Sequence, residues 1–171
     1  INGKVTAHMG EMSSEGMFGG IVGAGMGSLI SNCTAEAEIT IPDGMANAGI
    51  IGGGLEMTNV SGCYATGTVT AGNDCYGLGG ISGCGFAAEL FRENTAENVM
   101  ITAGSNSYWI GGITGYAHGQ VGSATSSYTV KNFAQVAITG RNAAGIASLA
   151  LANIYGAYNR GLVWTSTTGE N

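Results

Sequence analysis

A short glycine-rich motif recurs along the chain at intervals of 29 to 33 residues, and this internal repeat constrains the fold more than any other feature. Each copy joins small residues to an isoleucine. The five copies read GGIVG from Gly19, AGIIG from Ala48, GGISG from Gly79, GGITG from Gly111 and AGIAS from Ala144. The second glycine of each copy lies at Gly20, Gly49, Gly80, Gly112 and Gly145. The chain is therefore built from about five copies of one structural unit.

A second element follows each copy of the motif. It reads ISNCTAEAEIT from Ile30, VSGCYATGTVT from Val60, RENTAENVMIT from Arg92, VKNFAQVAIT from Val130 and, more loosely, IYGAYNRGLVWT from Ile154. An aliphatic residue followed by threonine closes the first four copies, at Ile39, Val69, Ile101 and Ile138. Because side chains alternate across a strand, we expect the aliphatic column to face the core and the threonine column to face solvent.

The composition favours strands joined by turns. Of the 171 residues, 32 are glycine and one is proline, 44% are apolar and 9% are charged, and helix-forming residues are sparse. Each repeat has about three short apolar segments separated by Gly-, Ser- or Asn-rich turns, which suits one coil of a β-solenoid with parallel stacked strands. We therefore predict a single all-β domain over residues 1–171, with about five coils of about 30 residues each.

The repeated isoleucines and glycines have different expected roles in such a coil. We expect the isoleucine column to fill the core. We expect the glycines to form corners, where they allow positive φ and close approach of the backbone. The isoleucines are Ile21, Ile50, Ile81, Ile113 and Ile146. The repeat glycines also include Gly19, Gly23, Gly52, Gly79, Gly83, Gly111 and Gly115.

The stretches GGIVGAGMGSLISNCTAEAEIT and AGIIGGGLEMTNVSGCYATGTVT, which begin at Gly19 and Ala48, resemble repeats of the GLUG-motif family. The similarity is closest in these two copies and loosest after Ala144. It implies a right-handed parallel β-helix in a large secreted or surface-anchored bacterial protein, a group that includes adhesin-like proteins. It also implies that the motif residues are structural and not catalytic.

Nucleotide and nucleic-acid binding are both disfavoured by the sequence. The stretch GIVGAGMGS is similar to a dinucleotide-binding loop. However, the last glycine of a G-x-G-x-x-G pattern starting at Gly23 would fall on Ser28, and no convincing helix follows. Five scattered cations and a net charge of −6 provide no basic patch for nucleic acid. Glycine and polar residues interrupt the apolar runs, so no membrane-spanning helix is expected.

The acidic residues suggest two further hypotheses that we do not favour. Glutamates fall on comparable strands at Glu36, Glu38, Glu93 and Glu97. We expect them to form a solvated face rather than a stripe that binds cations. Polysaccharide-cleaving β-helix enzymes need clustered acids or a basic residue beside a groove, whereas Asp43 and Asp74 both lie in turn sequences. We therefore expect no enzyme activity, no cofactor and no metal, and a polysaccharide-active enzyme is the least favoured function.

The four cysteines form two candidate pairs. Cys33 and Cys63 occupy equivalent repeat positions and should stack in adjacent coils, either as two reduced thiols or as a disulfide strained by the in-register parallel strands. Cys75 and Cys84 flank the corner sequence GLGGISG and are the more favoured disulfide. No C-x-x-C pair is present and both histidines are distant in sequence, so a zinc site is not expected.

Aromatic residues gather in the second half of the chain and suggest a binding surface there. The segment from Tyr116 to Tyr128 departs most from the repeat, and such insertions often carry the binding face of a repeat protein. We expect Tyr116, His118 and Tyr128 to contribute to this surface, because aromatic rings stack on sugars and fill protein interfaces.

The expected function is that of a non-catalytic structural module of an extracellular bacterial surface protein, or of a self-assembling fibre or stalk. A parallel β-helix needs its ends covered, and no amphipathic capping helix is visible in the sequence. We expect either flanking domains of the same protein or identical subunits stacked end to end to cover them. The alternative is an adhesin module that binds a glycan or a host protein.

Overall fold

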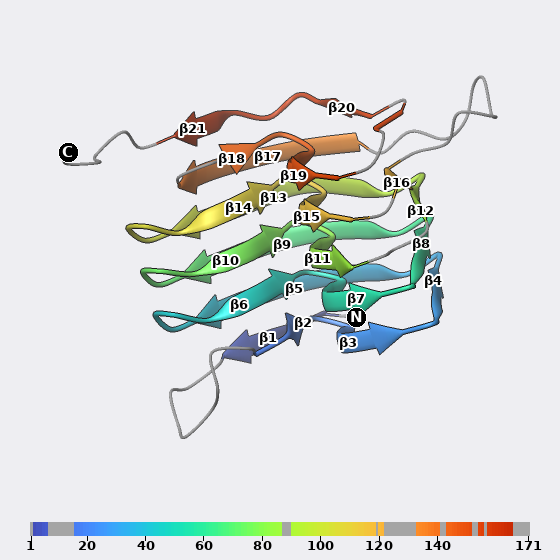
Figure 1. Ribbon diagram of the computed structural model, residues 1–171, viewed down its shortest axis with the longest axis horizontal. Helices are drawn as coiled ribbons and strands as arrows, with labels where there is room; N and C mark the ends of the chain where they lie inside the picture. Colours follow the sequence, from blue (N-terminus) through green and yellow to red (C-terminus); the bar gives the residue numbers. More distant parts are fainter. Residues whose placement is uncertain are drawn as a thin grey trace.

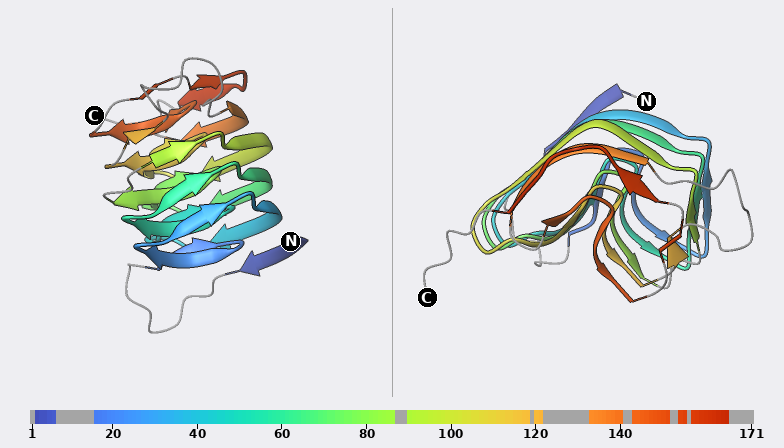
Figure 2. Two further views of the ribbon diagram at one scale, coloured as in Figure 1. Left: turned by 90° about the vertical axis from the view of Figure 1, so that its right-hand side faces the viewer. Right: turned by 90° about the horizontal axis from the view of Figure 1, so that it is seen from above.

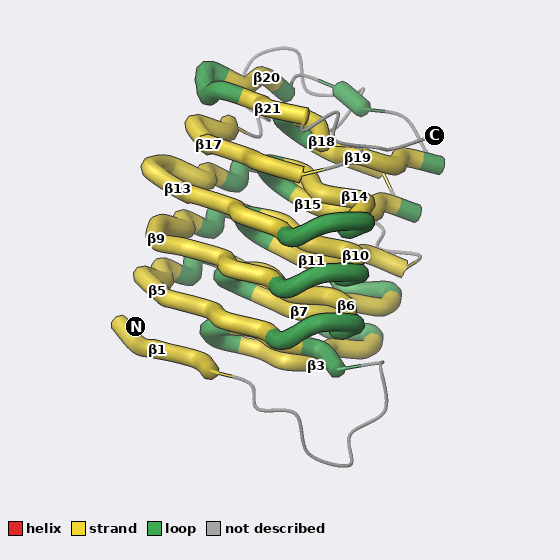
Figure 3. The backbone as a smooth tube through the Cα atoms, turned by 90° about the vertical axis from the view of Figure 1, so that its left-hand side faces the viewer, coloured by secondary structure: helices red, strands yellow, loops and turns green. Residues whose placement is uncertain are grey.

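The computed structural model describes residues 2–6, 16–86, 90–118, 120–121, 133–140, 143–151, 154–155 and 157–165. Within these residues the regular structure is entirely β-strand, and neighbouring strands pair in parallel. Successive coils stack along one axis, as Figures 1 and 3 show, and the strands form four sheets. The chain is therefore a parallel β-solenoid, as its repeats predict.

Sheet I contains the longest strands and forms one wall of the solenoid. It consists of β1 (Asn2–Thr6), β5 (Thr34–Ile41), β9 (Tyr64–Ala71), β13 (Thr95–Ala103), β17 (Phe133–Gly140), β20 (Tyr158–Asn159) and β21 (Val163–Thr165). Sheet II and sheet III form the opposite wall. Sheet II consists of β2 (Phe18–Gly19), β6 (Ala46–Gly49), β10 (Tyr76–Gly79), β14 (Tyr108–Gly111) and β18 (Ala143–Ala144).

Sheet III follows sheet II after a sharp bend, and the small sheet IV returns the chain to sheet I. Sheet III consists of β3 (Val22–Met26), β7 (Gly52–Glu56), β11 (Ser82–Phe86), β15 (Thr114–Ala117) and β19 (Ala147–Ala150). Sheet IV consists of β4 (Leu29–Ser31), β8 (Asn59–Ser61), β12 (Leu90–Arg92) and β16 (Gln120–Val121). One coil therefore uses four strands, whereas the three apolar segments of each repeat predict three. The strands of sheet IV are too short to stand out in the sequence.

The coil is right-handed. Seen from above in Figure 2, with the later coils nearer the viewer, the chain runs anticlockwise as it rises from sheet I through sheets II, III and IV. About three turns are complete in the described residues, with partial turns at both ends. This is slightly fewer than the five coils expected, although sheets II and III each contain five strands.

Strict alternation along sheet I separates the core from the solvated face. Along β5, every second residue from Ala35 to Ile41 is buried, and the residues between them are exposed. The aliphatic column Ile39, Val69 and Ile101 has no exposed surface, whereas the adjoining threonines of these coils are exposed. The predicted inward and outward columns are therefore confirmed for these three coils.

The isoleucine column also lies in the core, with one correction to the predicted register. Backbone hydrogen bonds join Ile21, Ile51, Ile81, Ile113 and Ile146 from each coil to the next. Gly49 pairs with Gly19 and Gly79. The predicted equivalence of Ile50 with Ile21 is therefore wrong by one residue. Ile50 is fully buried, but it takes the place that Gly20 has in the first coil.

The paired glycines of the motif provide space and do not need positive φ. The positive-φ residues of the described chain include neither Gly79 nor Gly80. A Cβ on Gly79 would lie 1.9 Å from the carbonyl oxygen of Ser82, and a Cβ on Gly80 would lie 2.9 Å from the methyl group of Ala96 on sheet I. The wall thus bends inward at the motif until it touches the opposite wall, as the view from above in Figure 2 shows.

The other corners use left-handed backbone, in columns that run through successive coils. Positive φ occurs at Gly27 and Met57; at Asn32, Gly62 and Glu93; at Gly44, Asp74 and Asn106; and at Asn47, Gly77 and Trp109. Most of these residues are Gly, Asn or Asp, which tolerate this conformation best. The predicted role of glycine at corners is therefore divided: some glycines supply positive φ, and those of the motif allow close approach.

The substitution Gly79→Ala tests the close approach. It should lower the free energy of unfolding by about 3 kcal/mol, because the new Cβ would meet the Ser82 carbonyl in the middle of the stack. Gly27→Ala is the matched control. Gly27 has a φ of 59° and open space around it, so alanine there should lower the free energy of unfolding by only about 1 kcal/mol, the cost of the left-handed conformation. Urea unfolding followed by circular dichroism measures both, and equal losses would contradict this role of the motif glycines.

Candidate functional site: an aromatic cluster on the side wall

Sheets II and III are in backbone contact beside the inward bend. A Cβ on Gly83 would lie 2.5 Å from the backbone nitrogen of Ala48, and a Cβ on Gly115 would lie 2.3 Å from the carbonyl oxygen of Trp109. Side chains that leave the two sheets on either side of this contact can therefore meet each other. In the third and fourth coils these side chains are aromatic.

An aromatic cluster occupies this position, made of Tyr76 on β10, Tyr108 and Trp109 on β14, Tyr116 on β15, and His118. Tyr76 and Tyr108 stack with ring centroids 5.3 Å apart and an interplanar angle of 10°. Trp109 stacks on Tyr116 at 5.1 Å and 21° and meets Tyr108 edge to face at 4.9 Å. His118 lies edge-on to Tyr116 at 6.4 Å. Five rings from two sheets thus form one continuous surface.

Trp109 adopts a backbone conformation that its side chain disfavours. Its φ is 56°, in the left-handed region. The equivalent residues of the two preceding coils are Asn47 and Gly77, which suit this region much better. A bulky residue costs about 1–2 kcal/mol there, and such strain is often found at functional sites. The aromatic cluster therefore includes a residue that the backbone alone would not select.

The cluster combines apolar ring faces with polar tips. Tyr76, Tyr108 and Trp109 are half-buried, Tyr116 is buried and His118 is exposed. Aromatic rings offer a flat apolar face, while tyrosine hydroxyls, the indole N–H and the imidazole can form hydrogen bonds. No lysine or arginine belongs to the cluster. This arrangement suits a neutral ligand with an apolar face and hydroxyl groups.

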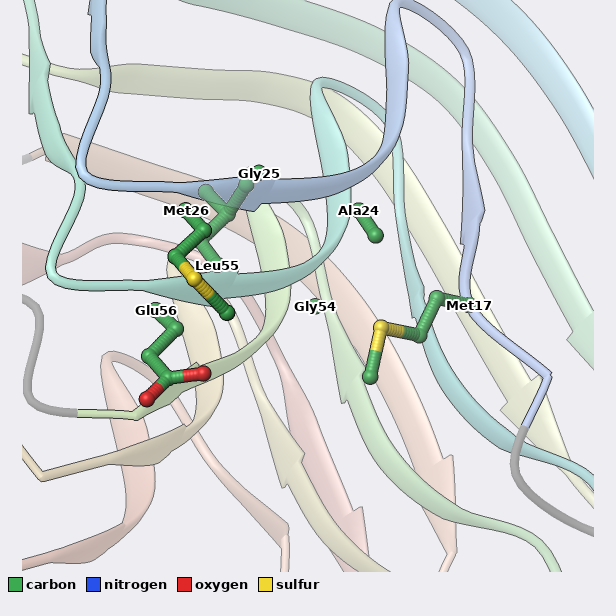
Figure 4. Close-up of a pocket in the computed structure, with 7 residues that line it drawn as sticks. All are labelled: Met17, Ala24, Gly25, Met26, Gly54, Leu55 and Glu56. Carbon is green, nitrogen blue, oxygen red and sulfur yellow. The ribbon is translucent and has the colours of Figure 1, made fainter.

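A separate cavity lies at the equivalent place in the first two coils, where the aromatic pair is missing. Its volume is about 170 Å³, and Met17, Met26, Gly54 and Leu55 contribute to its lining. Figure 4 shows Met26 beside Leu55 and Met17 on the far side of Gly54, with the Glu56 carboxylate near Met26. The register places Gly54 in line with Cys84 and Tyr116. Small residues in this column thus leave a cavity in the first two coils, whereas the Tyr116 ring fills the equivalent space in the fourth coil.

All four cysteines are free thiols. The Cys75 thiol donates to the Pro42 carbonyl at 3.2 Å, whereas Cys84 lies on β11, next to Tyr116 of β15 in the same column. The predicted Cys75–Cys84 disulfide is therefore wrong, because Cys75 lies in the turn before β10 of sheet II, whereas Cys84 lies on β11 of sheet III. Burial raises the pKa of the Cys84 thiol to about 12, so Cys84 is an unreactive core residue.

The solvated acidic face expected from the glutamates contains one specific contact. Glu36 and Glu38 are exposed on β5, and Glu97 accepts a hydrogen bond from the Tyr64 hydroxyl at 2.8 Å. This bond raises the pKa of Tyr64. Across the described ranges, no group of three or more His, Cys, Asp or Glu side chains is arranged to hold a metal ion.

Two of the three residues predicted for the binding surface, Tyr116 and His118, are neighbours in the aromatic cluster. Tyr128 lies outside the described residues. Tyr76 was not predicted from the sequence, and Tyr108 and Trp109 were not assigned to this surface. Tyr76 and Tyr108 pair in the register, and their separation of one repeat is the signal that could have identified them.

A comparison with protein families identifies the repeat. The model of the GLUG motif matches residues 14–40, a range that contains β2, β3 and β4 and nearly all of β5. The motif thus corresponds to one turn of the solenoid. No curated protein and no solved structure shows a match. Within the described residues, no helix is long and apolar enough to cross a membrane. The chain is a β-solenoid repeat module that carries the GLUG motif.

The strain at Trp109 can be tested by stability measurements. Trp109→Asn should lower the free energy of unfolding by less than about 2 kcal/mol, below the about 3–5 kcal/mol usual for removing a buried aromatic, because relief of strain offsets part of the lost stacking. Trp109→Ala removes the same contacts and should be about 1 kcal/mol less stable than Trp109→Asn. Thermal and urea unfolding measure the difference, and an alanine variant as stable as the asparagine variant would contradict the strain.

Proposed function

We propose that the chain is a non-catalytic structural module of an extracellular bacterial surface protein, and that its stack extends end to end through a second copy of the chain. The observation that carries this proposal is the unequal burial of one column. Ile51, Ile81 and Ile113 have no exposed surface, whereas Ile21 and Ile146, at the two ends of the same column, are only half-buried.

The strand edges at the first coil support the same proposal. β2, β3 and β4 are the last strands of sheets II, III and IV in the described chain. Their outer edges carry backbone N–H and C=O groups with no neighbouring strand in these sheets, and such edges pair readily with another chain. A further coil in register would cover both these edges and Ile21.

The non-catalytic part of the proposal is supported by what the motif residues do. The glycines bring the two walls together and the isoleucines fill the core, so each of these motif residues has a structural role. The bacterial and extracellular setting comes from the resemblance to GLUG repeats, and the low content of lysine and arginine suits a surface exposed to proteases.

End-to-end assembly should be sensitive to a charge at the stack end. We expect the wild-type chain to associate with rising concentration and to form rods in negative-stain electron microscopy. Ile21→Lys should weaken this association at least about tenfold, because the lysine stem can keep the intracoil packing while its ammonium group occupies the open end. Light scattering after size-exclusion chromatography measures the effect.

Met100→Lys is the matched control for this experiment. Met100 is 51% exposed on β13, so the same charge is added to the side wall of a middle coil. It should leave association unchanged, and circular dichroism should show both variants folded. Association blocked by Met100→Lys alone would move the interface to the side wall, and a monomer at every concentration would overturn end-to-end assembly.

A second candidate function, glycan binding by the module, is favoured by the aromatic cluster. Stacked, half-buried rings with polar tips suit the apolar face and hydroxyl groups of a neutral sugar. The net charge of −6 and the absence of cations in the cluster disfavour an anionic glycan.

Glycan binding predicts a specific loss on substitution of Trp109. A glycan array followed by calorimetry with neutral oligosaccharides should detect binding by the wild type and at least about tenfold weaker binding by Trp109→Asn, because one stacking face is removed. Tyr64→Ala is the matched control, because Tyr64 is a partly exposed ring on β9 outside the cluster. Equal weakening by both variants, or no binding by the wild type, would exclude the cluster as a glycan site.

A further inference from the structure

Cys33 and Cys63 lie one above the other at a corner of the solenoid. Each follows a left-handed residue, Asn32 or Gly62, and directly precedes the long strand of its coil. The next residues, Thr34 and Tyr64, are partners in the parallel register. Strands in such a ladder lie about 4.8 Å apart, which is within the Cα–Cα range of disulfides, about 4.4–6.8 Å.

The Cys63 thiol reaches out of its own coil toward the first coil. The Cys63 thiol contacts the carbonyl oxygen of Ile30 in the coil below, at 3.8 Å, so its sulfur points toward the first coil. Burial is the largest cause of the raised pKa of Cys63, and the neighbouring Cys33 thiol adds to it, so the two side chains are close. Each thiol also donates to the carbonyl two residues before it, Cys33 to Ser31 and Cys63 to Ser61. These contacts lie at a corner of the coil and not along a straight pair of strands.

The two thiols differ in their access to solvent. Cys33 is half-buried and is the most exposed of the four cysteines, whereas Cys63, Cys75 and Cys84 are buried. Burial raises the pKa of the Cys63 thiol. An oxidant therefore reaches Cys33 first, and Cys63 is the buried thiol that would react with it in the second step.

We propose that Cys33 and Cys63 form a disulfide that covalently joins the first coil to the second when the folded chain meets a disulfide oxidant, such as glutathione disulfide or a dithiol–disulfide oxidoreductase. The bond would fasten the first coil to the second. In sheets II, III and IV of the described chain, the first coil has a neighbouring strand on one side only. This inference concerns the coil itself and does not rest on the proposed assembly or glycan binding.

The reaction is a pair of thiol–disulfide exchanges. The Cys33 thiolate attacks one sulfur of the oxidant RSSR, forming a Cys33–SR mixed disulfide and releasing RS⁻. The Cys63 thiol loses its proton to solvent and its thiolate attacks the Cys33 sulfur, which forms the Cys33–Cys63 bond and releases the second RS⁻. Two protein thiols are thus oxidised and one RSSR is reduced to two RSH, so atoms and electrons balance.

The test uses the full chain and two matched double variants. In Cys75→Ser/Cys84→Ser only the proposed pair remains, and in Cys33→Ser/Cys63→Ser only the other two cysteines remain. Each folded protein is incubated with glutathione disulfide, alkylated after denaturation and analysed by mass spectrometry. The first variant should lose both free thiols with no bound glutathione, and the second should keep both.

Retention of both thiols in the first variant, a stable glutathione adduct on Cys33, or only disulfide-linked dimers would each overturn the proposal. The wild type provides a measurement that does not depend on the variants' folding. After oxidation it should keep two of its four thiols. Digestion after acidic residues should then yield one cross-linked species joining the peptides 16–36 and 57–74, which contain Cys33 and Cys63 as their only cysteines.

The disulfide should also make the folded chain more stable toward urea. Oxidised wild type should unfold at a higher urea concentration than the reduced protein, because the cross-link restricts the unfolded chain. The increase should be absent in Cys33→Ser/Cys63→Ser treated in the same way. An increase of equal size in that variant would assign the effect to another reaction of the oxidant and would contradict stabilisation by this bond.

Discussion

The backbone hydrogen bonds between coils are the interaction on which the rest of the structure depends. At the motif, the N–H of Ile51 bonds to the carbonyl of Ile81 at 3.0 Å, and the N–H of Ile81 bonds to that of Ile113 at 2.9 Å. Where the backbone turns away, a side chain takes its place, as when the Asp43 carboxylate accepts the N–H of Asn73 at 2.8 Å. A residue in such a ladder is bound from above and below, so its conformation is imposed on the whole column.

The inward bend adds a second constraint, because it brings two walls of the same coil together. In the first coil a Cβ on Gly20 would lie 3.1 Å from the Ala37 methyl group. In the second coil Ile50 takes the place of Gly20, and the partner of Ala37 in the register is Gly67, with a φ of 123°. Side-chain volume has moved from one wall to the other, which explains how AGIIG can replace GGIVG without separating the walls.

Features that recur once in every coil could be predicted from the sequence, whereas contacts that depend on the inward bend could not. The column of Ile39 and its equivalents was visible because it recurs once per coil. In AGIIGGG, however, two adjacent isoleucines fit the pattern equally well, and only the pairing of Gly49 with Gly19 selects Ile51. The contact of Trp109 with Tyr116 was not predictable, because it requires sheets II and III to touch. The Cys75–Cys84 prediction failed for the same reason: closeness in sequence does not specify the sheet.

The two constraints together explain why the aromatic cluster is placed on the side wall. Strands β10 and β18 pair with β14 on its two edges, so the ladder holds Trp109 in a left-handed conformation that an isolated tryptophan would avoid. Trp109 thus continues the column of Asn47 and Gly77 and adds an aromatic ring to it without a change in the backbone conformation. Trp109 remains only half-buried, so core packing alone is a weak reason to accept the strain. The proposed ligand, stacked on its exposed face, would supply a stronger one, and it would leave the strand edges at the ends free to pair with further coils.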